Sequence, residues 1–155
     1  MPVIGWDHVS LPAGDPEATL AFYKKLGFGT IDEEEWRAGK SKIFSIQVGP
    51  DAKLNFHGPQ LWQDPSFEAK GPAAKPGCGD LCIRFDGTLD EAIAMIRNAG
   101  VEIVYGPYDQ PGGAGQGRRE GTSVYTRDPD GNLIEFITYP AAGVGRWPTA
   151  STAAK

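Results

Sequence analysis

The chain has 155 residues, of which 40% are hydrophobic and 23% are charged, and its formal net charge at pH 7 is −5. This balance is typical of one folded domain and excludes a disordered chain, which would carry fewer apolar residues. The 15 Lys and Arg against 20 Asp and Glu exclude the basic surface that nucleic-acid binding requires. No apolar run approaches the roughly 20 residues of a membrane span, and the N-terminus lacks signal-peptide features. We therefore expect a cytoplasmic protein with no membrane partner.

The first third of the chain predicts a strand, a helix and then three strands. The helix is expected after the strand at 5–11, because Asp15 can cap it and Pro16 suits its first position. Gly27 provides its C-terminal stop. The three strands are expected at 29–36, 41–48 and 53–58. These elements make a first module of about residues 5–58.

The same order of elements recurs after a proline-rich segment at 59–78, which we expect to be a linker without regular structure. A strand at 79–85 precedes a helix that begins with the capping box Thr88 and Glu91 and ends at Gly100. Further strands are expected at 102–105, 122–127 and 132–138, and Asp128 to Asn132 predicts a hairpin turn between the last two, so the second module covers about 79–139. The two modules form one domain over 1–140, followed by a loose tail at 141–155.

The polar residues of the predicted strands gather on one face of each strand. Side chains alternate between the two faces of a strand, and the face opposite the apolar one carries His8, His57, Asp80 and Glu135. Imidazole and carboxylate groups together suit Fe, Zn, Ni, Co or Mn, and two histidines with one carboxylate can make a facial triad. The alternative is that the histidines are hydrogen-bonded structural residues and that Glu135 pairs with Arg84 or Arg127.

Five stretches of the sequence resemble one known family. They are Trp6 to Leu11, Ala21 to Phe28, Lys53 to His57, Val101 to Pro107 and Ser123 to Glu135. Over residues 5–139 the chain resembles the vicinal oxygen chelate superfamily, which groups glyoxalase I, bleomycin-resistance proteins, fosfomycin-resistance enzymes and extradiol dioxygenases. Within it, the chain is most similar to the glyoxalase-domain-containing protein 5 group. The resemblance implies an α+β fold in which two βαβββ modules form an open, curved eight-stranded mixed sheet or barrel with a central metal cleft.

The resemblance also implies a site. It predicts that His8, His57 and Glu135 bind a divalent metal ion (Ni, Zn, Co, Fe or Mn), that the substrate is a small molecule and that the protein is a homodimer. Asp80 departs from the family pattern, which more often has His or Glu there. A shorter Asp can instead orient a ligand or contact the substrate.

Three functions follow from this site. The first is a glyoxalase-like lyase or isomerase in which the metal polarises the substrate and a carboxylate, Glu135 or Asp80, moves a proton. We expect Arg84, Tyr125 and Arg118 to contact the substrate. Metal binding through the fourth-strand His57 favours this reading over the second, an Fe(II) extradiol-type dioxygenase. The third is a metal-free binding protein of the bleomycin-resistance type, in which a cleft lined by Trp6, Trp36, Trp62 and Phe67 holds a flat molecule.

The two cysteines and one glycine-rich stretch carry two further predictions. Cys78 and Cys82 would lie roughly 13 Å apart on an extended strand, too far for a disulfide, so we expect two reduced, buried thiols. The glycine-rich stretch 112–117 lacks the ending of a phosphate-binding P-loop. We expect it to form a lid in which Arg118 or Arg119 can meet an anionic substrate group.

Overall fold

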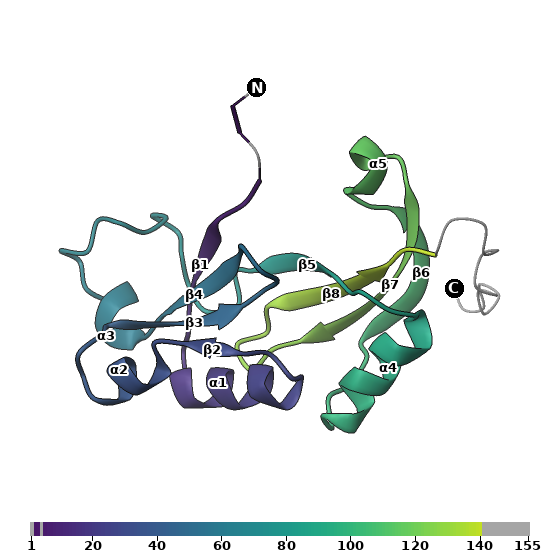
Figure 1. Cartoon of the computed structure of the whole chain (residues 1–155). Coiled ribbons are helices and arrows are strands. Elements are labelled where there is room, and N and C mark those ends of the chain that lie inside the picture. The colour runs from purple at the N-terminus through teal and green to yellow at the C-terminus, as the bar shows by residue number, and fades with distance from the viewer. Residues whose placement is uncertain (1, 4, 141–155) are drawn as a thin grey trace. The chain divides into compact units, whose positions relative to one another are not determined.

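The computed structural model describes residues 2–3 and 5–140, and the chain divides into two compact units. Unit 1 comprises Met1–Gly79 together with Asp128–Asn132, and unit 2 comprises Asp80–Arg127 and the chain from Leu133 onward. Each unit contains one four-stranded mixed sheet with helices (Figure 1). The predicted α+β fold with two similar modules is confirmed, and its eight strands form two separate sheets of four.

Unit 1 contains the predicted helix and four strands in the predicted order, together with two further short helices. They are β1 (His8–Pro12), α1 (Pro16–Lys25), β2 (Thr30–Ile31), α2 (Glu33–Arg37), β3 (Ile43–Gln47), β4 (Lys53–His57) and α3 (Pro59–Trp62). The strand order in the sheet is β1-β4-β3-β2, and only the β1–β4 pair is parallel. One face of this sheet is apolar and carries α1. There the buried ring of Tyr23 contacts Phe56, which in turn stacks on Phe44.

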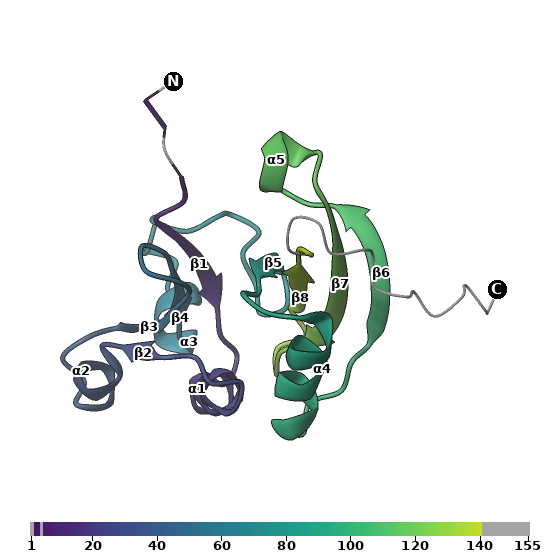
Figure 2. The same ribbon diagram turned by 45° about the vertical axis from the view of Figure 1, so that its right-hand side comes forward.

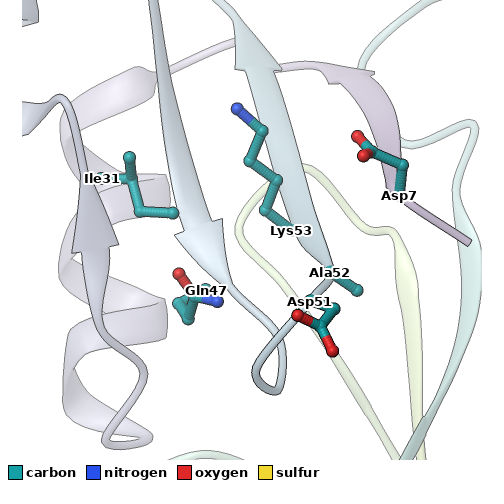
Figure 3. Close-up of a pocket in the computed structure, with 6 residues that line it drawn as sticks. All are labelled: Asp7, Ile31, Gln47, Asp51, Ala52 and Lys53. Carbon is teal, nitrogen blue, oxygen red and sulfur yellow. The ribbon is translucent and has the colours of Figure 1, made fainter.

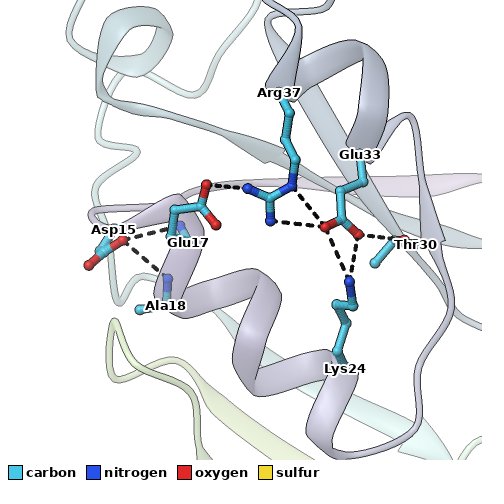
Figure 4. A network of polar contacts seen from close by, with 7 residues as sticks. All are labelled: Asp15, Glu17, Ala18, Lys24, Thr30, Glu33 and Arg37. Atoms are coloured by element: carbon cyan, nitrogen blue, oxygen red, sulfur yellow. Dashed lines mark hydrogen bonds and ion pairs between the residues drawn. The ribbon is translucent and has the colours of Figure 1, made fainter.

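The first helix has the predicted cap, and a surface ion-pair network joins it to α2 (Figure 4). The Asp15 carboxylate accepts hydrogen bonds from the backbone N–H groups of the first turn. Glu33 accepts from Lys24, Thr30 and Arg37, and this hydrogen bonding, led by Lys24, lowers the pKa of the Glu33 carboxyl. Because Lys24 and Arg37 are about half exposed, the network fixes the position of α2 more than it adds stability.

Unit 1 also includes the turn Asp128–Asn132, although the chain on either side of this turn belongs to unit 2. The buried Asp128 carboxylate accepts hydrogen bonds from the backbone of Asp130 and Asn132 and from the side chains of Asn132 and Tyr23. Asp130 accepts from the backbone N–H of Gly14. The predicted turn is therefore confirmed, and its carboxylates attach it to the α1 region of unit 1.

Unit 2 repeats the module. Its elements are β5 (Asp80–Arg84), α4 (Leu89–Asn98), β6 (Tyr105–Pro111), α5 (Ala114–Gly117), β7 (Glu120–Arg127) and β8 (Leu133–Thr138), with strand order β5-β8-β7-β6. The predicted Thr88–Glu91 capping box begins α4, and this helix packs against β7 and β8 (Figure 2). The opposite face of the sheet is left for polar side chains.

Three predicted elements differ from the structure. The strand expected at 29–36 is reduced to two residues, and α2 follows it, because Glu33–Glu35 favour the first turn of a helix. The strand expected at 102–105 is β6, which runs over Tyr105–Pro111. Its prolines are tolerated because β6 is the edge strand of its sheet. The expected linker contains the short helix α3.

Two further sequence predictions concern the C-terminal tail and membrane spans. The tail predicted at 141–155 lies outside them. Among residues 2–3 and 5–140, no helix is long and apolar enough to cross a membrane.

Candidate functional site

The polar face of unit 2 is organised around one buried carboxylate, Glu135 on β8. Its Oε1 atom accepts hydrogen bonds from the Ser123 hydroxyl and from the Gln110 amide, each at 2.5 Å. The Gln110 amide also donates to the Tyr125 hydroxyl at 2.8 Å. These side chains come from β6, β7 and β8, so the carboxylate is held from across the sheet.

Two neighbours of Glu135 have pKa values that are raised by this environment. Cys82 on β5 and Tyr125 on β7 lie directly beside Glu135 in the strand registers. Burial, together with the charge of Glu135, raises the pKa of the Cys82 thiol to about 12. Burial and the same charge raise the pKa of Tyr125. Both groups therefore keep their protons at neutral pH, and both can donate hydrogen bonds on this face.

Of the remaining sequence-predicted residues of unit 2, Asp80 and Arg84 lie on the same face, and Arg118 lies outside the sheet. Asp80 and Arg84 flank Cys82 at a spacing of two residues on β5, so all three side chains leave the sheet on one side. Arg118 follows α5 and is exposed. Cys82 is also exposed, as is Cys78. The expectation of buried thiols is therefore wrong, because β5 is an edge strand and carries its cysteine on the polar face.

In unit 1, the first predicted ligand is already oriented by a carboxylate. Nδ1 of His8 lies 2.5 Å from Oδ1 of Asp7, and this hydrogen bond lowers the pKa of the Asp7 carboxyl. When Nδ1 carries the shared proton, Nε2 is left with its lone pair, which is the arrangement of histidines that bind metals. Asp7 also lines a pocket of about 130 Å³ together with Lys53 and Gln47 (Figure 3).

The second predicted ligand, His57, faces a larger cavity of about 290 Å³. Other walls of this cavity come from Ser10, Trp62 and Lys70. The imidazole of His57 is buried, and burial lowers its pKa. His57 is therefore neutral at pH 7, the form in which imidazole binds a metal. The ring of Phe67 packs edge-on against it.

The strand register fixes the spacing of the two histidines. His8 is paired with Lys53 and His57 with Pro12, so the histidines share a face of the sheet but stand four residues apart along it. That spacing is roughly 13 Å along the strands, with Ser10 and the buried Asn55 between them. Both imidazoles reach one ion only if they lean toward this midpoint.

The predicted ligands are divided between the two units. His8 and His57 belong to unit 1, whereas Asp80 and Glu135 belong to unit 2. Within the part of the chain that the structure describes, no group of three or more His, Cys, Asp or Glu side chains that could hold a metal ion is found. The triad of His8, His57 and Glu135 therefore stays a prediction.

The four aromatic residues predicted to line a cleft have different surroundings. Trp62 lines the His57 cavity and donates a hydrogen bond to the backbone of Ala13, and Phe67 contacts His57. Trp36 packs against Phe44 on the apolar face, and Trp6 is 82% exposed. Trp62 is thus a wall of the His57 cavity, whereas Phe67 contacts the histidine itself.

Sequence reasoning missed Gln110, Ser123 and Asp7. Gln110 fell outside the predicted strand, since that strand was expected to end at 105. Once β6 is placed at Tyr105–Pro111, alternation puts Gln110 on the face of Ser123 and Tyr125. The signal for Asp7 was its position directly before a candidate metal-binding histidine.

Comparison with known proteins gives consistent matches. The family model of the Glyoxalase/Bleomycin resistance protein/Dioxygenase superfamily matches residues 5–136. The virulence protein STM3117 of Salmonella typhimurium is 37% identical over 134 residues, covering 86% of this chain and 83% of that protein. Its crystal structure superposes with a TM-score of 0.74 at 32% identity, over 90% of this chain and all of the other.

Two further matches are more distant. The glyoxalase domain-containing protein RDO1 of Mycosarcoma maydis is 31% identical over 136 residues, covering 88% of this chain and 69% of that protein. The crystal structure of lactoylglutathione lyase from Agrobacterium tumefaciens has a TM-score of 0.63 at 21% identity, over 88% of this chain and 95% of the other, and shares the fold alone.

Proposed function

Because the chain belongs to the Glyoxalase/Bleomycin resistance protein/Dioxygenase superfamily, we propose that it is a divalent-metal-dependent, glyoxalase-like lyase or isomerase. Its metal ligands are His8, His57 and Glu135, and its substrate is a small molecule with two neighbouring oxygens. We also propose that the chain belongs to the glyoxalase-domain-containing protein 5 group within this superfamily. The observation that carries the proposal is the carboxylate of Glu135, which is buried in a sheet and yet surrounded by hydrogen-bond donors.

The donor chemistry of these residues fits a divalent metal. Carboxylates that bind metals are commonly held by further hydrogen bonds, and their histidine partners commonly donate to a carboxylate. Glu135 is held by Ser123 and Gln110, and His8 bonds to Asp7. His57 supplies a neutral imidazole. These features favour Ni, Zn, Co, Fe or Mn over Mg or Ca, which prefer oxygen ligands alone.

A bound metal would supply Lewis acidity, which stabilises negative charge that develops on a substrate oxygen. The chain's own residues would handle the proton. Glu135, or Asp80 if it is free, accepts a proton from carbon and returns it to the neighbouring position. Ser123 and Gln110 keep the Glu135 carboxylate in one orientation during this transfer. Tyr125, whose pKa is raised, can donate a hydrogen bond to the substrate, and Arg84 and Arg118 attract an anionic part of it.

A metal-free binding protein is the second candidate, and one observation favours it. The cavity of about 290 Å³ beside His57 has Trp62 and Pro12 among its walls, and its size is close to the lower end of small-molecule sites. In that function His57 and Ser10 would hydrogen-bond a ligand. The cavity then needs no metal.

Metal binding separates the two candidates. We expect protein purified without added metal to carry metal by elemental analysis, or to bind Ni²⁺, Zn²⁺ or Mn²⁺ tightly in calorimetry. His8→Ala, His57→Ala and Glu135→Gln should each weaken the affinity at least tenfold. Asp109→Asn is the matched control, because Asp109 is a carboxylate on β6 whose partner is Thr122. Less than a tenth of a metal ion per chain, with no binding in the titration, would reject the enzyme.

The reaction class is tested on metal-loaded protein. The proposed lyase or isomerase should turn over methylglyoxal with a thiol, or exchange the carbon-bound proton of a related hydroxycarbonyl with solvent deuterium. Oxygen uptake with catechols would instead identify the Fe(II) dioxygenase. If Glu135→Gln retains full turnover, the role of Glu135 in proton transfer is wrong.

A further inference from the structure

Two arginines of unit 2 meet at one tyrosine. The guanidinium of Arg84, at the end of β5, lies 5.4 Å from the centroid of the Tyr139 ring. The guanidinium of Arg119, directly before β7, lies 5.3 Å from the same centroid. Both guanidinium groups are within the range of cation–π attraction to the ring. The two guanidinium carbons are therefore at most about 11 Å apart.

The tyrosine is itself held in place by a glycine-rich segment. Its hydroxyl accepts a hydrogen bond from the backbone N–H of Ala114 at 3.3 Å. Gly112 passes so close that a Cβ atom there would overlap both the Tyr139 hydroxyl and Ile137. The glycine-rich stretch is thus attached to Tyr139 at this point, and the ring is a fixed support for both arginines.

Neither arginine at this support has an ion-pair partner among residues 2–3 and 5–140. The ion pairs found in unit 1 include neither Arg84 nor Arg119. Arg119 donates one hydrogen bond to the backbone carbonyl of Pro140 at 2.6 Å, which orients it without neutralising it. Both arginines are exposed, so an anion can reach them from solvent.

Arg84 and Tyr139 lie close in sequence to residues of the polar face around Glu135. Tyr139 lies four residues after Glu135, and Arg84 lies two residues after Cys82, the neighbour of Glu135 in the register. Residues at even spacings along a strand share a face, so Arg84 lies on the Glu135 face, and Tyr139 follows the last residue of β8, Thr138. The chain from Glu135 to Tyr139 spans at most about 14 Å, about the length of a small metabolite.

We propose that Arg84, Arg119 and Tyr139 form an anion-binding site for a carboxylate or phosphate group of a small molecule. The forked guanidinium groups match the oxygens of either anion, and a bound anion offsets the repulsion between two cations that share one ring. Of the two arginines predicted to meet an anionic group, Arg118 and Arg119, the site uses Arg119 and joins it to Arg84. It needs neither metal nor turnover, so it stands or falls separately from the proposed lyase.

The test uses the full chain in metal-free buffer with two probes, inorganic phosphate and succinate. Each is titrated at constant ionic strength while the arginine Nε–Hε resonances are followed by NMR. We expect saturable shifts of the Arg84 and Arg119 resonances. Because single exposed charge pairs are weak, Arg84→Gln and Arg119→Gln should each raise the dissociation constant by about three- to fivefold. Phosphate binding alone would assign the site to phosphate esters, and binding of succinate alone would assign it to carboxylates.

Two control variants make the result specific. Arg97→Gln removes the same charge from the last turn of α4 and should leave binding unchanged. Tyr139→Phe keeps the ring and should bind within twofold of the wild type, whereas Tyr139→Leu removes the support and should weaken binding as the arginine variants do. If neither probe shifts the two arginines more than Arg97, or if Arg97→Gln weakens binding equally, the proposal is overturned.

Discussion

The thiol of Cys82 should react far more slowly than its exposure implies. The residue is exposed, so a reagent can reach it, but burial of the sulfur and the charge of Glu135 raise its pKa from 9.0 to about 12. Three pH units mean about a thousandfold less thiolate at pH 8 than an ordinary thiol has. A thiolate of higher pKa is a stronger nucleophile, and this raises the rate constant of the thiolate by about 16- to 30-fold. The net expectation is alkylation roughly 30- to 60-fold slower than for an unperturbed thiol.

The assay is iodoacetamide alkylation followed by mass spectrometry, in EDTA so that metal binding plays no part. A Cys78→Ser background leaves Cys82 as the single thiol, and the same chain in urea gives the reference rate. We expect the folded protein to react roughly 30- to 60-fold more slowly than the unfolded chain at pH 8. Equal rates would refute the reasoning, because they would show that the fold does not suppress the thiolate.

Two substitutions then separate the causes of the raised pKa. Glu135→Gln removes the neighbouring negative charge, so the thiolate is less opposed and alkylation should accelerate. Asp80→Asn removes the smallest of the four contributions, so it should accelerate the reaction less. A larger effect from Asp80→Asn than from Glu135→Gln would contradict the placement of Cys82 beside Glu135.

Three other predictions concern stability. Asp128→Ala leaves several buried donors without an acceptor and should lower the free energy of unfolding by about 2–4 kcal/mol in urea titrations. Gly112→Ala should cost about 1–3 kcal/mol because its Cβ overlaps Tyr139; Gly113→Ala, with open space around it, should stay within about 0.5 kcal/mol, and equal losses would contradict the close approach. Since burial lowers the pKa of His57, the unfolded chain binds a proton more readily. Stability should therefore fall as the pH drops below the ordinary His value of 6.5, and His57→Phe should flatten that dependence.

Local signals explain most of what could be predicted of the fold. The caps at Asp15 and Thr88, the stops at Gly27 and Gly100 and the turn at Asp128–Asn132 each act within a few residues, so they could be read directly. The strand at 29–36 failed because Glu33–Glu35 satisfy helical preferences as well as a polar strand face. The edge strand Tyr105–Pro111 failed because its prolines are compatible with a strand only at a sheet edge, and edge position is a tertiary property.

The candidate site divides in the same way. Alternation placed His8, His57, Asp80 and Glu135 on the polar faces of their strands, because a two-residue period is intrinsic to extended backbone. The spacing of the two histidines depended on the parallel register of β1 and β4, which pairs residues about 45 positions apart. No local pattern encodes such a register.

The sequence by itself determined that the chain carries two similar modules, which residues bound the helices and which strand faces are polar, since each of these depends on neighbours in the chain. Only the tertiary structure decided that Gln110 and Ser123 hold Glu135, that Cys82 is exposed yet its thiol is hard to ionise, and that Arg84 and Arg119 meet at Tyr139. Those contacts join different strands, and their existence depends on how backbone pairing aligns distant segments.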